Sequence, residues 1–212
     1  MNKEIIKKAL AELKQTPKRN FTQSYDLIVN LKHFNPKQDT VKFVVHLNNS
    51  IGKEIKIGAF VGLELLSQAK EVCDVVIQED DLINYKDPKK AKALANSCDF
   101  FIAQANLMPK VAQAVGKVFG VRKKMPDPKM GCVVPPSGDL KSLKSNLSQS
   151  ILIDNKRAMN IQCYAGKEDQ PEEELIDNIQ ALIKAIIEHL PSEGQNVKSI
   201  DLKLTMSKPV RL

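Results

Sequence analysis

Side chains that could make chemical contacts gather in two short stretches near opposite ends of the chain. One reads Arg-Asn-Phe-Thr-Gln-Ser-Tyr-Asp at 19–26, and the other reads Leu-Thr-Met-Ser-Lys-Pro-Val-Arg at 204–211. Neither stretch holds a nucleophile beside a base or a set of metal ligands. Both place small hydroxyl groups and apolar side chains beside cations, and proteins bind structured RNA through its 2′-hydroxyls and phosphates. The two stretches therefore suit RNA binding better than catalysis.

The first stretch leads into a segment with the alternation of a half-buried strand. Apolar side chains recur with a period of two at Phe21, Tyr25, Leu27, Val29 and Leu31. The opposite face then carries polar side chains, namely Thr22, Ser24, Asp26, Asn30 and Lys32. This face is the expected contact surface of the strand.

The second stretch ends a strand that the pattern predicts over 197–206. Because alternate residues of a strand share a face, Ser199, Lys203, Thr205 and Ser207 are expected on one face. Helices predicted over 3–15 and 172–190 each carry one apolar stripe, and the stripe of the second predicts that it packs on a sheet.

The middle of the chain has a different pattern. Helices predicted at 62–70, 87–97 and 107–119 alternate with short apolar strands at 74–77 and 99–103. Strands that are apolar on both faces and alternate with helices indicate a small parallel α/β unit. The loop-rich stretch 131–150 is then the return crossing. The first and last segments together form one α+β domain, and the α/β unit is inserted into it.

Composition favours a soluble protein with a polyanionic partner. The chain has 212 residues, of which 42% are hydrophobic, and no apolar run reaches the eighteen or so residues of a membrane span. Its first residues lack the apolar centre of a signal peptide, so a cytosolic protein is expected. The net charge is +7, and residues 1–59 hold 11 Lys and Arg against 5 Asp and Glu. Six acids near the start of the 172–190 helix, Glu168, Asp169, Glu172, Glu173, Glu174 and Asp177, are expected to complement its dipole and to face away from RNA.

The cysteines and histidines predict neither a metal site nor a cofactor. The four cysteines, Cys73, Cys98, Cys132 and Cys163, form no CxxC pair and are interpreted as small core residues. The three histidines, His33, His46 and His189, are equally dispersed. No cofactor is expected.

One motif leaves an alternative of another class open. The run Gly116-Lys117-Val118-Phe119-Gly120 could contact phosphate, but it lacks the spacing of a nucleotide-binding loop and does not follow a strand directly. A helix end at Gly120, followed by cations that favour the helix dipole, is the simpler interpretation. Similarly, Glu79-Asp80-Asp81 and the Lys86–Lys92 run are interpreted as solvated faces, with weak nonspecific RNA contact as the sharper interpretation of the lysine run. A nucleotide-using enzyme with its site in the insertion remains the rival hypothesis.

Three motifs in order give the chain a resemblance to a known family. They are Arg19-Asn20-Phe21 leading into Asp26–Lys32, Met125-Pro126-Asp127-Pro128-Lys129 after a glycine-bearing helix end, and Ser199 followed by Thr205-Met206. In these the chain resembles the ribosomal protein L-one family, in its archaeal form, over nearly its whole length. The family's Thr-Met-Gly is Thr205-Met206-Ser207 here.

The resemblance implies a non-catalytic protein of the large ribosomal subunit. Its fold would be a discontinuous α+β RNA-binding domain, residues 1–60 and 151–212, with an inserted three-layer, Rossmann-like α/β domain at 61–150. Its partners would be large-subunit rRNA in the mobile stalk, tRNA at the exit site and its own mRNA as a translational repressor, with no membrane partner, and it would be a monomer when free. A ribosome-assembly factor of the same fold is the alternative within this class. The expected RNA-binding residues are Arg19, Phe21, Thr22, Ser24, Asp26, Lys156, Ser199, Lys203, Thr205, Met206 and Ser207.

Overall fold

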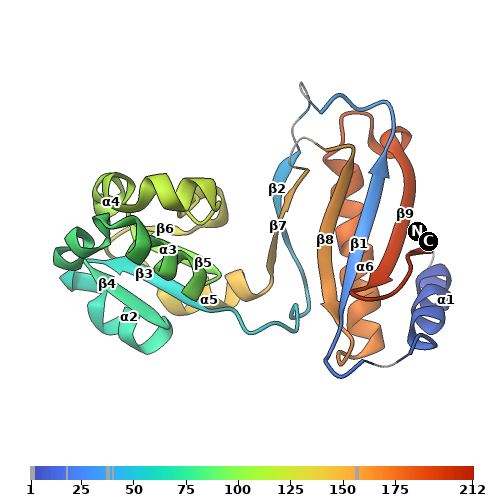
Figure 1. Cartoon of the computed structure of the whole chain (residues 1–212), viewed down its shortest axis with the longest axis horizontal. Coiled ribbons are helices and arrows are strands. Elements are labelled where there is room, and N and C mark those ends of the chain that lie inside the picture. Colours follow the sequence, from blue (N-terminus) through green and yellow to red (C-terminus); the bar gives the residue numbers. More distant parts are fainter. Residues whose placement is uncertain (1–2, 18, 37–38, 40, 156–157) are drawn as a thin grey trace. The chain divides into compact units, whose positions relative to one another are not determined.

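The contacts of the chain divide it into two compact units. A computed structural model describes residues 3–17, 19–36, 39, 41–155 and 158–212. The first unit combines residues 1–53 with 149–212, and the second, which we call the inserted unit, spans 54–148 (Figure 1). The crossings expected at 60 and 150 are thus displaced to 53 and 148. The first moves because β3 (Ile57–Val61) pairs with β4 (Val75–Gln78) and β5 (Phe100–Gln104) of the inserted unit.

The first unit is built on an antiparallel sheet in the order β10-β9-β1-β8. Its strands are β1 (Ser24–Leu31), β8 (Asn160–Lys167), β9 (Val197–Leu204) and β10 (Val210–Arg211). The helices α1 (Lys3–Lys14) and α6 (Glu172–Glu188) contribute to the same core as the buried face of the sheet (Figure 1). The alternation in β1 is as predicted, because Tyr25, Leu27, Val29 and Leu31 are buried. The strand begins at Ser24, however, so Phe21 lies in the preceding loop rather than in the strand.

A two-stranded ribbon completes the first unit. It consists of β2 (Lys42–His46) and the antiparallel β7 (Ser150–Asp154), and the second of these strands was not predicted. Val45 and Ile153 bury their side chains in the core of the unit, while the Phe43 ring stacks on His189 at 3.8 Å between ring centroids. The ribbon is therefore packed into the first unit on both of its strands.

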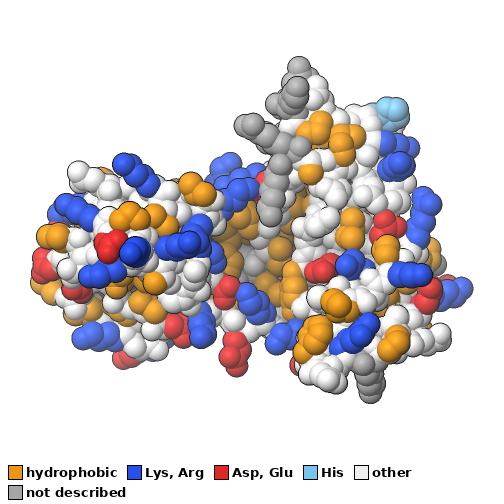
Figure 2. All heavy atoms as spheres, viewed as in Figure 1, with side chains coloured by type: hydrophobic (Ala, Val, Ile, Leu, Met, Phe, Trp, Pro, Cys, Tyr) orange, Lys and Arg blue, Asp and Glu red, His pale blue; other side chains and the backbone are white. Residues whose placement is uncertain are grey.

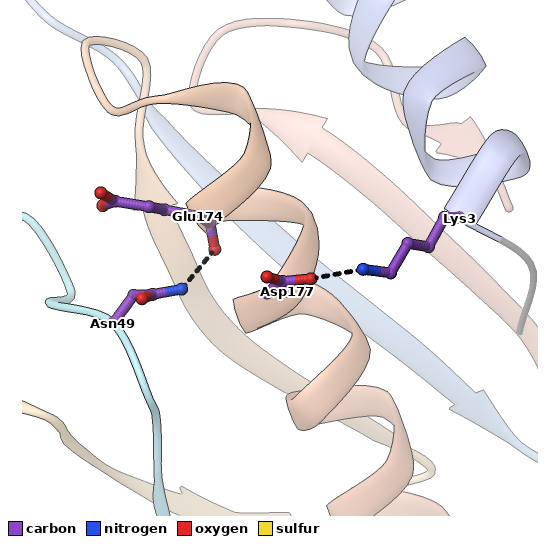
Figure 3. A network of polar contacts seen from close by, with 4 residues as sticks. All are labelled: Lys3, Asn49, Glu174 and Asp177. Atoms are coloured by element: carbon purple, nitrogen blue, oxygen red, sulfur yellow. Dashed lines mark hydrogen bonds and ion pairs between the residues drawn. The ribbon is translucent and has the colours of Figure 1, made fainter.

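Helix α6 is contacted by two segments from the start of the chain. Lys3 of α1 forms an ion pair with Asp177 at 2.9 Å, and Asn49 donates a hydrogen bond to the Glu174 carbonyl at 3.5 Å (Figure 3). A second pair joins Lys14 to Glu172. Because exposed ion pairs contribute about 0–1 kcal/mol, the buried apolar side chains of α1 contribute more to its attachment. These are Ile6, Ala9, Leu10 and Leu13.

The inserted unit has three layers around a parallel sheet in the order β4-β3-β5-β6, where β6 is Val133–Val134. Helices α2 (Leu66–Val72) and α5 (Leu140–Ser148) share a core with one face of the sheet. Helices α3 (Pro88–Ser97) and α4 (Met108–Val121) share a core with the other face. The mixed α/β content with a parallel sheet agrees with the prediction, but the supposed loop crossing at 131–150 contains both β6 and α5.

Short 3-10 helices join several of these elements. In the inserted unit they span Leu63–Leu65, Asp80–Lys86, Ala105–Leu107 and Pro128–Met130, and in the first unit Glu193–Asn196 precedes β9. The predicted helix end at Gly120 is wrong by one residue, because α4 continues to Val121 and its chain reversal uses Lys123 at φ 55°. None of the described helices is long and apolar enough to cross a membrane.

The two cores predict separable responses to cavity-forming substitutions. Leu10 is fully buried in the first unit, and Ile77 is 2% exposed in the inserted unit. Leu10→Ala should lower the free energy of unfolding of the first unit by about 2–5 kcal/mol, and Ile77→Ala that of the inserted unit by a similar amount. Hydrogen exchange followed by mass spectrometry in urea assigns each loss to its unit. Equal losses of protection in both units for both variants would show a single cooperative body.

A pair of tyrosines allows a matched test of hydrogen bonding in the first unit. The buried Tyr25 hydroxyl has no hydrogen-bond partner among the described residues, whereas the Tyr164 hydroxyl donates to the Ile51 carbonyl at 3.1 Å. Tyr25→Phe should therefore raise the free energy of unfolding by about 1 kcal/mol, and Tyr164→Phe should lower it by about 0.5–1.5 kcal/mol. Urea unfolding at pH 7 measures both, and a destabilised Tyr25→Phe would contradict the assignment.

The buried Tyr25 also gives a prediction at high pH. Burial, with Glu168 and Glu172 nearby, raises the pKa of Tyr25 from 10.0 to about 12. The folded state then favours the neutral phenol, while the unfolded chain loses this proton near pH 10. The free energy of unfolding of the unmodified protein is therefore unaffected by this group below pH 10 and falls as the pH rises to 12, which urea unfolding at several pH values measures. The gain in stability from Tyr25→Phe should increase across this range.

Candidate nucleic-acid interface

The two stretches singled out in the sequence meet at one end of the sheet in the first unit. Strand β9 ends at Leu204, and Thr205 to Ser207 form a turn beside the start of β1. The Thr205 amide donates to the Ser24 carbonyl at 3.1 Å, and the Ser24 amide donates to the Thr205 hydroxyl at 3.2 Å. Backbone pairing thus brings Ser24 and Thr205 together, and the Thr205 hydroxyl already accepts a hydrogen bond within the protein.

Gln23 joins three segments at this junction, although the sequence analysis did not select it. Its side chain is 3% exposed and accepts a hydrogen bond from the Met206 amide at 3.1 Å. Its backbone pairs with Glu168, whose amide donates to the Gln23 carbonyl at 2.9 Å and whose carboxylate accepts from the Gln23 amide at 3.3 Å. The available signal was a polar residue at an inward position, since Gln23 has the same parity as Tyr25 and Leu27.

Two large apolar side chains are exposed on either side of this junction. Phe21 is 51% exposed and Met206 is 58% exposed. Neither side chain therefore belongs to the core. A shallow depression beside Phe21 is lined by Arg19, Asn20, Phe21, Thr22, Glu168 and Asp169. Phe21 and Met206 are available for contact with a partner that has flat apolar faces.

Acidic groups also lie at this depression, contrary to expectation. Glu168 and Asp169 line it together with Arg19, whereas Glu172 and Asp177 are engaged with α1. The six acids therefore do not act as one group. Glu168 and Asp169, which line the same depression as Arg19, oppose its attraction for phosphate.

The open face of the sheet continues from the junction as three cross-strand rows. From β8 through β1 to β9 they are Tyr164, Asp26 and Lys203, then Gln162, Ile28 and Asp201, and then Asn160, Asn30 and Ser199. Burial raises the pKa of Asp26, and the Lys203 ammonium opposes this shift. Lys203 thus partly balances the carboxylate in the row nearest the junction.

Ser199 lies at the far end of this face. It pairs with Asn30, six residues from Ser24 along β1, which places it about 20 Å from the junction. The Ser199 hydroxyl accepts a hydrogen bond from the side-chain amide of Asn30 at 2.9 Å and donates to the Asp201 carboxylate at 3.3 Å. The expectation that Ser199, Thr205 and Ser207 share one strand face is wrong, because the last two lie in the turn after the strand.

Three further residues were predicted to bind RNA, namely Thr22, Lys156 and Ser207. Ser207 holds the turn, since its hydroxyl accepts from the Leu204 amide at 2.8 Å and lies 3.0 Å from the Lys208 carbonyl. Thr22 is exposed in the loop after Phe21. Lys156 lies outside the described residues.

The chemistry that this surface lacks is also informative. Within the described part of the chain, no three His, Cys, Asp or Glu side chains are placed to hold a metal ion. All four cysteines are free; Cys98, Cys132 and Cys163 are buried as predicted, whereas Cys73 is only partly buried. Burial raises the pKa of Cys163 to about 12 and that of Cys132 to about 11. A thiol with a raised pKa is a poor nucleophile at neutral pH.

The inserted unit does not support the nucleotide-binding alternative. Gly116 and Gly120 are both inside α4, so they form no phosphate-binding loop. In parallel sheets of this kind, ligands bind where the strand order reverses, which here is between β3 and β5. That position is filled by Gln104, which accepts from the Gly62 amide at 2.8 Å and donates to Glu64 at 3.1 Å.

Comparison with known proteins is consistent with these features. The model of the "Ribosomal protein L1p/L10e family" matches residues 13–208. The "Large ribosomal subunit protein uL1" of Methanobrevibacter smithii is 38% identical over 100% of both chains. The protein of the same name from Methanothermococcus thermolithotrophicus is 38% identical over 100% of this chain and 99% of its own. That of Thermoplasma acidophilum is 33% identical over 100% of this chain and 97% of its own.

These matches cover almost every residue of the chain, and they are to ribosomal proteins rather than to enzymes. The chain therefore belongs to the ribosomal protein L1p/L10e family, in its archaeal form.

Proposed function

We propose that the first unit is an RNA-binding domain that holds large-subunit rRNA, with the junction of Ser24 and Thr205 at the centre of the interface. The observation that carries this proposal is the exposure of Phe21 and Met206 on a junction that hydrogen bonds hold in place. Large apolar side chains exposed beside a hydrogen-bonded framework suit unpaired bases, which stack on them. The relatives, which are named as proteins of the large ribosomal subunit, support the choice of rRNA.

Each side chain of the interface has a distinct role in this proposal. Arg19 and Lys203 attract phosphates, and this contribution weakens with salt. Phe21 stacks on a base, and Met206 packs against a sugar or base beside it. Thr22 and Asp26 accept hydrogen bonds from 2′-hydroxyls, and Ser199 extends the contact along the open face. Lys156 contributes a further cation to phosphate attraction. Ser24, Thr205 and Ser207 shape the backbone that approaches the RNA, because their groups are largely engaged within the protein.

In this proposal the protein works on the ribosome in the cytoplasm. The rRNA that it holds belongs to the mobile stalk beside the tRNA exit site, and the inserted unit forms a separate domain that assists the release of tRNA. The same interface also binds an RNA of similar shape in the protein's own mRNA, so that free monomeric protein represses its own translation. A ribosome-assembly factor of the same fold is the second candidate. It would be favoured if crosslinking in cells recovered precursor rRNA rather than mature large-subunit rRNA.

Stacking and charge make different predictions for two neighbouring residues. Phe21→Ala should weaken binding to a stalk rRNA fragment by tenfold to a hundredfold, because a base–aromatic stack contributes about 1–3 kcal/mol. The dependence on salt should stay unchanged, since no charge is lost. Arg19→Gln should instead reduce the slope of log K against log salt by about 0.7–0.9. Filter binding at several salt concentrations measures both quantities.

Ile5 provides the matched control for Phe21. It is a large apolar side chain of the same unit, 42% exposed on α1, and Ile5→Ala should change RNA affinity less than twofold. Equal losses for Ile5→Ala and Phe21→Ala would place the interface elsewhere, and the proposed junction would have to be given up.

The domain division makes a further prediction about a shortened chain. Residues 1–53 joined to 149–212 by a flexible Gly/Ser linker of about ten residues should fold and bind the rRNA fragment within about tenfold of the whole chain. The loop up to Gly52 must be retained, because Ile51 is buried in the core of the first unit. Circular dichroism and filter binding test the two parts. A folded but RNA-inactive chain would show that the inserted unit carries an essential part of the interface.

A further inference from the structure

Two helices on one side of the inserted unit, α3 and α4, carry charges of a single sign. Helices α3 and α4 together contain Lys89, Lys90, Lys92, Lys110 and Lys117, and neither contains an acidic residue. All five lysines are exposed. In Figure 2, the face of this unit that carries α3 and α4 in Figure 1 shows mostly blue charged side chains. The net charge of the whole unit does not reveal this layer, because 14 Lys and Arg stand against 11 Asp and Glu over residues 54–148.

Several acids of the inserted unit are engaged in backbone hydrogen bonds, although Asp87 among them caps the start of α3 and Asp81 lines the same depression as Lys90. Five aspartate carboxylates accept hydrogen bonds from backbone amides. Asp74 accepts from Ile57 and Asp99 from Lys56. Asp87, Asp127 and Asp139 each accept from the residue two positions later, which is Lys89, Lys129 or Lys141. Glu79 pairs with Lys110. Lys89, Lys90, Lys92 and Lys117 form no ion pair with a described carboxylate, so their charge is directed to solvent.

The opposite side of the same sheet provides an internal comparison. There, Lys141 of α5 pairs with Glu71 of α2 at 3.2 Å, and Lys144 donates to the Val72 carbonyl at 2.6 Å. Two of the three lysines on α2 and α5 are thus engaged within the protein, whereas the exposed Lys70 forms no ion pair with a described carboxylate. The asymmetry between the two sides is not required by the fold, because both helical layers cover the same parallel sheet.

Part of the positive charge at the end of α4 has a structural use. Lys124 donates to the carbonyls of Cys98 and Asp99 at 3.1 and 2.8 Å, and Arg122 contacts Asn96. Cations at this position also favour the dipole of α4. Lys89 in the first turn of α3, Lys92 and Lys117 have no such role, so their charges are available to an external partner.

We infer that the α3–α4 face is a second RNA contact, which holds backbone phosphates by charge and reads no sequence. This inference rests on the proposed function, since it takes RNA as the partner of the chain. A protein partner fits less well, because protein interfaces need a buried apolar or aromatic centre. Between the lysines the two helices expose the small or amide side chains of Ala93, Asn96, Ala112 and Gln113, and the large exposed Val121 lies only at the end of α4.

The small residues also set how closely a phosphate backbone can approach. A Cβ added at Gly116 or Gly120 would meet no atom within 4 Å, so the surface is open at both positions. Lysines on flexible stems around such an open surface suit an irregular row of phosphates, because an ammonium is a point charge with no fixed geometry. The contact is therefore expected to be weak, strongly dependent on salt and indifferent to sequence.

Two double variants of the full chain with the same loss of charge test this inference. Lys89→Gln with Lys92→Gln removes two cations from α3, and Lys70→Gln with Lys141→Gln removes two from α2 and α5 on the other side of the sheet. The probe is a mixed-sequence RNA duplex of about 20 base pairs. The α3 variant should reduce the slope of log K against log salt by about 1.4–1.8 and weaken duplex binding about tenfold in 0.1 M salt. The control variant should change both quantities much less.

Other outcomes would overturn the inference in recognisable ways. Equal losses for the two double variants would mean diffuse attraction to the whole unit. Competition by polyglutamate as strong as that by the duplex, at equal charge, would identify an acidic protein rather than RNA as the partner. Neither result affects the preference of the protein for the stalk rRNA fragment over the duplex, which Phe21→Ala probes separately. Loss of that preference in the unmodified protein would instead refute the proposed function.

Discussion

The insertion of β1 between β8 and β9 is the interaction on which the first unit depends. Strand β1 comes from the start of the chain, and both of its neighbours follow the inserted unit in sequence. The two antiparallel ladders satisfy the backbone groups on both edges of β1 and turn its apolar residues toward α6. They also set the register that places Ser24 beside Thr205. If that pairing slipped by one residue, the buried and open faces of β1 would exchange, and the candidate interface would be lost with the core.

The sequence was most informative where one residue pattern had one physical cause. The period of two in β1 and the apolar stripe of α6 follow from burial on one side of a sheet, and the structure agrees with both. The ends of these elements were less predictable. Phe21 continues the alternation of β1 but lies in a loop, because Gln23 is recruited to bind Met206 and Glu168 across the junction. No local pattern shows a partner that is more than 140 residues away in the chain.

At the candidate site, too, the sequence did not predict where the strand ends. The sequence identified the right two stretches, but it placed Ser199 and Thr205 on one regular face. The strand ends between them, since the Ser207 hydroxyl bonds to the Leu204 amide and forces a turn. Likewise, Gly120 was interpreted as a helix end and Gly116 to Gly120 as a possible phosphate contact, but neither glycine requires a positive φ or a close approach, so the helix continues through both. Hydroxyl and glycine residues have several structural uses, and tertiary hydrogen bonds decide among them.

The central position of β1 also constrains the order in which the protein acquires its function during synthesis. β1 leaves the ribosome first, but β8, β9 and the turn at Thr205 are made only after the entire inserted unit. The inserted unit holds all four strands of its own sheet within 54–148, so it has every residue that it needs before the first unit does. β1 must wait without its ladder partners, and such long-range pairing is slow to form. Nascent chains therefore cannot present the junction, and only a fully synthesised protein carries the proposed RNA interface.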